Sequence, residues 1–317
     1  MAELITIGEP LVTYVSKDMD RGLVESLNWS KIMGGAELNV MVGATRLGHT
    51  TEYVTQVGTD PFGQYVINEI GRQKVGNSYI STSSDYWTGH QLKELVSQGD
   101  PATFNYRKGS AASQMEKTRI DEIDFSEVKW AHLSGIFPGT SLTARETFRY
   151  FAEQLIARGI HTTFDPNLRP PLWESEEVMR QTVNDLAKQG EIVLPGINEG
   201  KILMGSENPE AIADFYLSNG GITHTVIVKL GAAGAYVKTK SGESYTVPGF
   251  KVDKIVDTVG AGDGFAVGLL TAQLEGKNLK ESVRRACAIG AMAIMTPGDN
   301  DGYPTAEQLE AFYQTQK

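Results

Sequence analysis

The sequence has little cysteine and no long apolar run. Cys287 is the one cysteine among 317 residues, which excludes an internal disulfide and argues against a thiolate metal site. The longest apolar stretch, residues 286–295, is far shorter than the ~20 residues that a membrane-spanning helix needs. The N-terminus lacks the basic start and the apolar run of a signal peptide. These absences predict a cytoplasmic protein with no membrane partner.

Positive charge is also scarce. Lysine and arginine together number 29, against 39 aspartate and glutamate residues, and the formal net charge is −10. A nucleic-acid-binding protein would carry a strongly basic face, so we expect no nucleic-acid partner. The 40% hydrophobic and 21% charged residues are typical of a globular chain. If a chain with this net negative charge binds an anion, its positive charges must be concentrated at the binding site.

Short runs typical of β-strands alternate with helical patterns along most of the chain. We expect strands at 4–7, 53–57, 130–134, 162–164, 192–194 and 225–228, and helices that begin at Pro61 and span 141–158, 174–188 and 198–204. This alternation predicts an α/β fold with a parallel sheet that is covered on both faces. No internal repeat or linker is visible, so residues 1–317 are expected to form one domain.

Two segments, about 12–33 and 86–112, break this alternation. Both hold polar and aromatic β-forming residues without a helical period. We interpret them as a small β-sheet that acts as a lid. The alternative interpretation is a pair of surface hairpins without a role.

The strongest local motif is D-T-V-G-A-G-D at 257–263, which runs into a helical pattern. Small residues before a helix let backbone N–H groups converge on an anion, and the helix adds its positive dipole end. A carboxylate there would repel a phosphate unless it had another task, such as taking a proton from an attacking hydroxyl, and this predicts that Asp263 is a general base. The alternative is a plain glycine turn. The two common nucleotide motifs, G-x-x-x-x-G-K-[ST] and G-x-G-x-x-G, are absent here.

A second pattern lies near the N-terminus. It comprises G-G-A-E-L-N at 34–39, R-L-G at 46–48 and V-G-T-D-P-F-G at 57–63. Together with the motif at 257–263 it resembles the ribokinase-like (PfkB) family of carbohydrate kinases, over essentially the whole chain. The resemblance implies a three-layer α/β/α sandwich with a mostly parallel central sheet and a small β-sheet lid. It also implies phosphoryl transfer from ATP with Mg²⁺, with a monovalent cation such as K⁺ as a further cofactor to test, and a homo-oligomer formed through the lid.

The resemblance assigns roles to individual residues. It implies that Asp263 is the catalytic base and that the anion hole is formed by Gly260, Ala261 and Gly262. It implies that ATP is contacted by Asn198, Lys229, Gly231 and Gly234, and also by two glycines of the anion hole, Gly260 and Gly262. Glu199 is implied to act indirectly at the metal, although Gly196 stands where the family often has an asparagine. Without the family, residues 231–234 read equally well as a simple hairpin turn.

Two arginines bear on the substrate. Arg107 lies in the expected lid and Arg169 follows an expected strand, and strand C-terminal ends are where open α/β sheets bind ligands. Guanidinium groups hold carboxylates bidentately, so the pair predicts a substrate with an acid group. The alternative is two arginines in surface ion pairs.

Three segments resemble the subgroup of this family that phosphorylates the terminal (6-) hydroxyl of 2-keto-3-deoxygluconate. They are G-E-P at 8–10, Y-R-K-G-S-A-A at 106–112 and D-P-N-L-R-P-P-L-W at 165–173. The resemblance implies substrate contacts by Gly34, Tyr106, Arg107, Arg169 and Asp263. One position departs from it: Asn105 stands where relatives often have a tyrosine. Ribokinase-like sugar kinases in general often have an aspartate after the first strand, where this chain has Glu9.

Other functions remain open from the sequence. Within the family they are fructokinase, ribokinase or a related deoxy-sugar-acid kinase, and the arginine pair argues against the neutral sugars. Outside it, a non-catalytic regulator that binds a sugar or nucleotide is disfavoured by Asp263. A dehydrogenase is disfavoured because no dinucleotide fingerprint is present.

Overall fold

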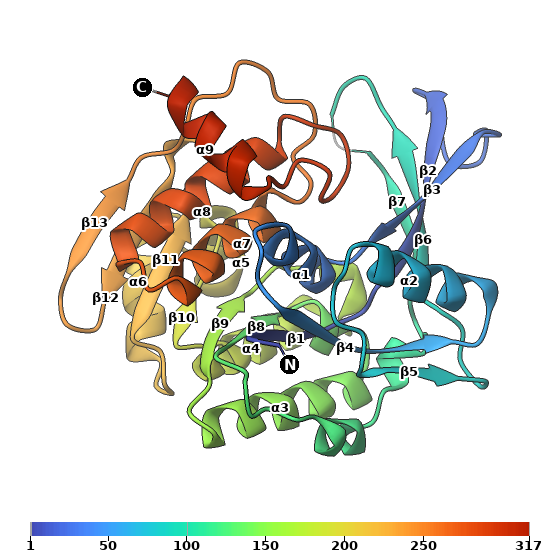
Figure 1. The fold of residues 1–317 in the computed structure, drawn as a ribbon, viewed down its shortest axis with the longest axis horizontal. Helices are drawn as coiled ribbons and strands as arrows, with labels where there is room; N and C mark the ends of the chain where they lie inside the picture. Colours follow the sequence, from blue (N-terminus) through green and yellow to red (C-terminus); the bar gives the residue numbers. More distant parts are fainter. Residues whose placement is uncertain (1, 100, 317) are drawn as a thin grey trace.

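The computed structural model describes residues 2–99 and 101–316 and contains a nine-stranded central sheet (Figure 1). Its strand order is β13-β12-β11-β10-β9-β8-β1-β4-β5. The neighbours from β11 to β5 pair in parallel, and only β12 and β13 run antiparallel at one edge. The predicted α/β class with a mostly parallel sheet is therefore confirmed. The strands are β1 (Leu4–Ile7), β4 (Thr51–Gly58), β5 (Ile80–Ser83), β8 (Trp130–Ser134), β9 (His161–Asp165), β10 (Ile192–Val193), β11 (Thr225–Lys229), β12 (Ala235–Thr239) and β13 (Ser244–Val247).

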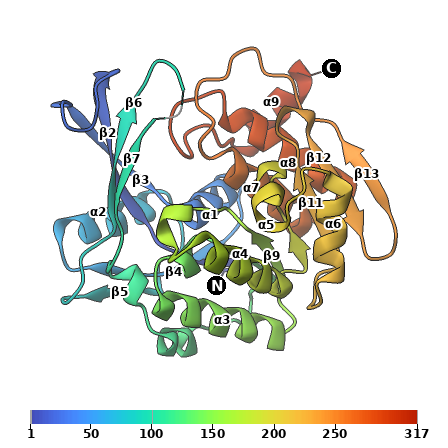
Figure 2. The ribbon, with the colours of Figure 1, turned by 180° about the vertical axis from the view of Figure 1, so that it is seen from behind.

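Helices cover both faces of this sheet (Figures 1 and 2). On one face lie α1 (Ala36–Arg46), α2 (Pro61–Arg72), α7 (Ala261–Leu274), α8 (Leu279–Ala293) and α9 (Ala306–Thr315). On the other lie α3 (Leu142–Ala157), α4 (Glu176–Leu186), α5 (Ile197–Met204) and α6 (Pro209–Ser218). Each face has its own apolar core, and all four residues of β1 and all five of β8 are buried. Strands buried on both faces are what a covered parallel sheet requires.

Side-chain caps set where the helices begin. Asp60 accepts hydrogen bonds from the backbone N–H groups of Phe62 and Gly63, so α2 begins at Pro61 as expected. Ser141 caps α3 in the same way, so the expected helix at 141–158 begins one residue later. None of the helices in the described part of the chain is long and apolar enough to cross a membrane.

The two segments that interrupt the alternation form a second, four-stranded sheet, the lid sheet. Its strands are β2 (Leu11–Met19), β3 (Trp29–Gly34), β6 (His90–Leu95) and β7 (Thr103–Tyr106), in the order β3-β2-β6-β7. The lid sheet stands beside the central sheet and extends upward at the right of Figure 1. Because β2 pairs in parallel with β6, the two segments are joined across a long stretch of sequence. The predicted β-sheet lid is confirmed.

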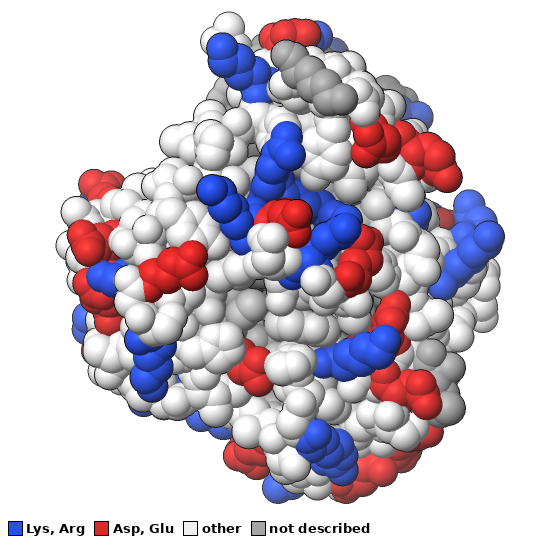
Figure 3. Space-filling view, turned by 60° about the vertical axis from the view of Figure 1, so that its left-hand side comes forward, with Lys and Arg blue, Asp and Glu red and all other residues white. Residues whose placement is uncertain are grey.

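Charge is unevenly distributed on the surface. On the face shown in Figure 3, lysine and arginine side chains gather near the middle, and acidic side chains lie mostly around them and toward the edges. Positive charge is thus concentrated locally on this face, although the chain as a whole carries a net charge of −10.

Candidate active site

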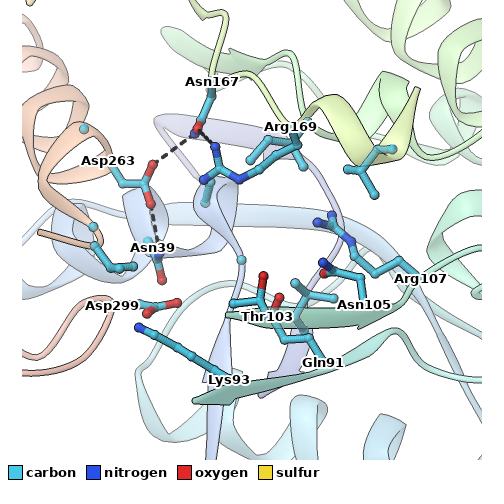
Figure 4. A pocket seen from close by; sticks show the side chains of 18 of the residues that line it. Asn39, Gln91, Lys93, Thr103, Asn105, Arg107, Asn167, Arg169, Asp263 and Asp299 are labelled. Carbon is cyan, nitrogen blue, oxygen red and sulfur yellow. Dashed lines mark hydrogen bonds between the residues drawn. The ribbon is translucent and has the colours of Figure 1, made fainter. Parts of the chain in front are cut away.

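A cavity of about 550 Å³ lies where the lid sheet meets the start of α7 and the loop that follows β9 (Figure 4). Its wall brings together segments that are far apart in the sequence. The polar side chains on this wall are Asn39, Gln91, Lys93, Thr103, Asn105, Arg107, Asn167, Arg169, Asp263 and Asp299. The wall therefore combines three cationic side chains, Lys93, Arg107 and Arg169, with the carboxylate of Asp263 at the start of α7.

The motif at 257–263 forms the N-terminal end of α7. Gly260 has φ +79°, and a side chain there would collide with the carbonyl oxygen of Asp299, so glycine is required on both grounds. Tyr303 donates its hydroxyl hydrogen to the Gly260 carbonyl at 2.7 Å and holds the turn. Gly260 and Gly262 line the cavity, and the helix begins at Ala261. The three predicted anion-hole residues thus surround the positive end of a 14-residue helix.

Asp263 lies in the first turn of α7 and is 9% exposed. Its Oδ2 accepts a hydrogen bond from Asn39 Nδ2 at 2.9 Å, and its Oδ1 accepts a longer one from Asn167 Nδ2 at 3.3 Å (Figure 4). Burial raises the pKa of this carboxyl to about 7, against the opposing hydrogen bond from Asn39. A carboxylate that titrates near neutral pH, with one weakly occupied oxygen, can accept a proton from a hydroxyl in the cavity.

A chain of amide hydrogen bonds extends from Asp263 in both directions. Asn300 Nδ2 donates to Asn39 Oδ1 at 2.8 Å, and on the other side Arg169 Nη1 donates to Asn167 Oδ1 at 2.8 Å. Asn167 adopts φ +40°, a left-handed conformation that asparagine tolerates better than most residues. The sequence analysis assigns no role to these three asparagines, although Asn39 and Asn167 lie in segments that carry the resemblance.

The structure brings Arg107 and Arg169 to one cavity. Figure 4 shows both guanidinium groups directed into it, Arg107 from the lid side and Arg169 toward Asp263. Arg107 is 5% exposed and forms an ion pair with Glu9, whereas Arg169 is exposed and is held by Asn167 and the Leu168 carbonyl. Two separate segments therefore contribute arginines to one cavity, and the contact of these arginines with a substrate stays a prediction.

Two other predicted substrate contacts lie off the cavity wall. Tyr106 is on the opposite face of β7, where its ring stacks on His90 with centroids 4.8 Å apart, and Asn105 lines the cavity instead. The contact predicted for Tyr106 does not fit this placement, because side chains alternate faces along a strand. Gly34 is buried behind the wall, and a side chain there would come within 2.8 Å of Asp299 Oδ2.

A partly buried ion pair lies beside the anion hole. Lys229 Nζ is 2.6 Å from Asp165 Oδ2, and a side chain at Gly262 would come within 3.7 Å of that ammonium group. Burial lowers the pKa of Lys229, but Asp165 and Glu199 outweigh this effect and raise it, so the cation persists. Lys229 thus provides fixed positive charge next to the helix terminus.

The remaining predicted nucleotide and metal residues lie outside the cavity. Gly231 and Gly234 form the hairpin between β11 and β12, and Asn198 is exposed at the start of α5. Both carboxylate oxygens of Glu199 accept backbone N–H bonds, from Gly196 at 2.6 Å and Leu168 at 2.9 Å. Within the described residues no group of three or more His, Cys, Asp or Glu side chains could hold a metal.

These features agree with a family assignment by sequence. Residues 1–306 match the model of the pfkB family carbohydrate kinases. The chain belongs to this family. It is 39% identical over 316 residues to the 2-dehydro-3-deoxygluconokinase of Bacillus subtilis, covering 99% of this chain and 96% of that protein. It is also 25% identical to the 5-dehydro-2-deoxygluconokinase of Clostridium perfringens, covering 99% of this chain and 94% of that protein.

Solved structures of the family share the fold. The PfkB protein from Polaromonas sp. JS666 is 37% identical, with a TM-score of 0.87 over 98% of this chain and 100% of that one. A putative ribokinase II from E. coli in complex with ATP and Mg²⁺ gives a TM-score of 0.88 at 24% identity, over 99% and 100% of the chains. A double mutant of the fructokinase from Vibrio cholerae O395, with fructose, ADP and potassium ion bound, gives a TM-score of 0.85 at 24% identity, over 98% of both chains. The protein is thus a sugar kinase of the PfkB fold and family.

Proposed function

We propose that this kinase transfers the γ-phosphoryl group of ATP to the terminal 6-hydroxyl of 2-dehydro-3-deoxy-D-gluconate (2-keto-3-deoxygluconate). The products are 2-dehydro-3-deoxy-6-phospho-D-gluconate and ADP. The observation that carries the proposal is the presence of two guanidinium groups, Arg107 and Arg169, in one cavity with Asp263. A neutral sugar would leave Arg169 and the Nη groups of Arg107 without an anionic partner in the cavity, because Glu9 bonds to Arg107 through Nε. A sugar carboxylate binds such guanidinium groups bidentately. The 39% identity to a 2-dehydro-3-deoxygluconokinase supports the same substrate.

The geometry supports one role for Asp263, which accepts the proton, and another for the start of α7 and Lys229, which stabilise the transferring group. The substrate hydroxyl approaches Oδ1 of Asp263, the oxygen with the longer hydrogen bond, and passes its proton to it. The hydroxyl oxygen then bonds to the γ-phosphorus while the bond to the bridging β–γ oxygen breaks and ADP leaves. The N–H groups at the start of α7 and the Lys229 ammonium face the charge on the transferring group.

The residues near the anion hole fit a metal that arrives with the nucleotide. Mg²⁺ is commonly held by one or two carboxylates together with substrate phosphates and waters, so it needs no closed protein site. Glu199, whose oxygens hold backbone N–H groups, would act on it indirectly, and Asn198, Gly231 and Gly234 remain predicted ATP contacts. When bound, Mg²⁺ neutralises the triphosphate charge. Dependence on K⁺ also remains a prediction.

A coupled ADP-release assay over a panel of acceptors tests the proposal. The panel contains 2-dehydro-3-deoxygluconate, its galactonate epimer, 5-dehydro-2-deoxygluconate, fructose and ribose. We expect the first acid to exceed the neutral sugars in kcat/KM by about tenfold or more, the worth of one charged hydrogen bond. A neutral sugar as the best acceptor would refute the sugar-acid assignment while leaving a family kinase. No acceptor-dependent ADP release at all would favour a non-catalytic binding protein.

A further inference from the structure

A buried ion pair lies where the end of β1 meets the lid sheet. Arg107 Nε donates to Glu9 Oε2 at 2.6 Å, and the Ser110 hydroxyl donates to Glu9 Oε1 at 2.5 Å. Glu9 is 0% exposed. Gly89, next to β6, packs directly against the same carboxylate, and a side chain there would collide with Oε1. Contacts from the residue before β6 and from the segment after β7 therefore fix the position of the Glu9 carboxylate.

The hydrogen bond from Nε determines how Arg107 faces the cavity. A guanidinium group is planar, with its five N–H donors in a rigid fork. Because Nε is bonded to Glu9, the plane of the fork is set, and the group points into the cavity (Figure 4). Its Nη groups have no hydrogen bond within the described part of the chain. Glu9 does not line the cavity, and Arg107 is the cavity residue that its carboxylate holds.

A second buried acid lies nearby but does not hold the arginine. Glu37 on α1 is 0% exposed, and neither of its carboxylate oxygens has a hydrogen-bond partner within the described chain. Burial raises the pKa of this carboxyl to about 7, so it is partly protonated at neutral pH. Glu9 is the acid in direct contact with Arg107, and the orientation of the fork depends on it.

We infer that Glu9 is a positioning residue that orients Arg107 for a carboxylate and so contributes to the preference for sugar acids. The inference rests on the proposed function, because it requires an acid group in the cavity. An arginine that is free to rotate must be ordered when the substrate binds, and that ordering weakens binding. Loss of the orientation should therefore raise KM for the acid more than it lowers kcat.

The test is a double-mutant cycle between Glu9 and Arg107, with Glu9→Asp as the first variant. Aspartate keeps the charge but is one methylene shorter, so it cannot reach Arg107 Nε and Ser110 together. We expect KM for the sugar acid to rise about tenfold, as for the loss of a charged hydrogen bond. The kcat value and KM for ATP should change by no more than about twofold. In an Arg107→Gln background, Glu9→Asp should have no further effect on the acid.

Two further variants keep the test decisive. Ser110→Ala removes the second hydrogen bond to Glu9 and should raise KM for the acid by a smaller factor. Asp185→Asn is the matched control, because it breaks the Arg149–Asp185 ion pair of 2.8 Å outside the cavity and should leave KM unchanged.

The outcomes separate this inference from the proposed function. If the wild-type protein phosphorylates no sugar acid, the proposed function fails and the inference fails with it. If acids are substrates but the effect of Glu9→Asp persists in the Arg107→Gln background, only the inference is overturned. Should Glu9→Asp not fold, Ser110→Ala decides, and an unchanged KM for the acid overturns the inference.

Discussion

At the scale of single residues, Asp263 has the most direct consequence for activity. Asp263→Asn should lower kcat by about 10²–10⁴-fold, the usual contribution of a positioned general base, with a much smaller change in substrate binding. In the wild-type protein the base must be deprotonated to act. Since burial raises its pKa to about 7, kcat/KM should increase as pH rises through 7 and then level off. Initial rates from pH 5.5 to 9 measure both effects, and near-normal kcat in the variant would remove Asp263 from the mechanism.

Arg169 gives a second prediction at this scale. Arg169→Ala should lower kcat/KM for the sugar acid by about ten- to hundredfold, because a charged hydrogen bond is worth roughly 1.5–3 kcal/mol. The loss on fructose should be small. Arg169→Lys should restore the acid only in part, because lysine lacks the bidentate fork. Equal losses on the acid and on fructose would indicate a structural role for Arg169.

Some residues of the site could be predicted from the sequence, but their long-range hydrogen bonds could not. Asp263 was predictable because a carboxylate at an anion-binding helix start is chemically unusual. Asn167 and Glu9 were visible in the sequence, but their partners are 96 and 98 residues away, at Asp263 and Arg107. Only the packing of the lid against the end of β1 shows that Arg107 is paired inside the protein. A hydrogen-bond network between distant segments leaves no periodic pattern in the local sequence, so it cannot be predicted from such patterns.

At the scale of elements, the lid sheet was the least regular part of the chain to interpret. Its segments were recognised because their β-forming residues lack a helical period. The parallel pairing of β2 with β6 could not be predicted, because it joins residues about 80 positions apart, such as Val12 and His90. Side-chain alternation in β7 then decides which residues face the cavity, and it turns Asn105 inward and Tyr106 outward.

The outer face of the lid sheet leads to a prediction about assembly. Phe104 and Tyr106 lie on β7 with ring centroids 5.0 Å apart and remain 55% and 45% exposed. Exposed aromatic pairs on a sheet favour association with an apolar surface, and we propose that a second copy of the chain covers this one. Sedimentation should show a homo-oligomer that Phe104→Lys shifts toward monomer. Leu142→Lys, which changes a 65% exposed residue on α3, is the control. A monomeric wild-type protein at micromolar concentration would contradict the prediction.

At the scale of the whole molecule, the sandwich with its two apolar cores buries carboxyl groups, among them those of Glu37 and Asp263. The alternating pattern predicted the sheet and the helices beside it, because a strand buried on both faces is a mostly apolar run, as in β11. It did not predict that Glu37, in the first turn of α1, would be fully buried. A glutamate at that position is ordinarily an exposed residue near the helix dipole, and only the packing of α1 against the sheet encloses it.

The burial of Glu37 should make the stability of the whole protein depend on pH. Its pKa is about 7 in the folded protein and 4.5 ordinarily, so between these values the folded chain keeps a proton that the unfolded chain has lost. Stability should therefore fall as pH rises through this range and level off above it. The full change is worth roughly 3 kcal/mol at 1.36 kcal/mol per pKa unit. Asp263 acts in the same direction, because its pKa is also raised to about 7.

Glu37→Gln separates this contribution from that of Asp263. Glutamine cannot ionise, so the variant should be more stable than the wild type at pH 8 by up to about 3 kcal/mol and similar to it at pH 5. Urea unfolding at both values measures the difference. Glu153→Gln, an exposed position on α3, is the matched control and should follow the wild type at each pH. If Glu37→Gln shows the same fall in stability as the wild type, the carboxyl of Glu37 is not the group that titrates, and the decline must come from Asp263 or another buried acid.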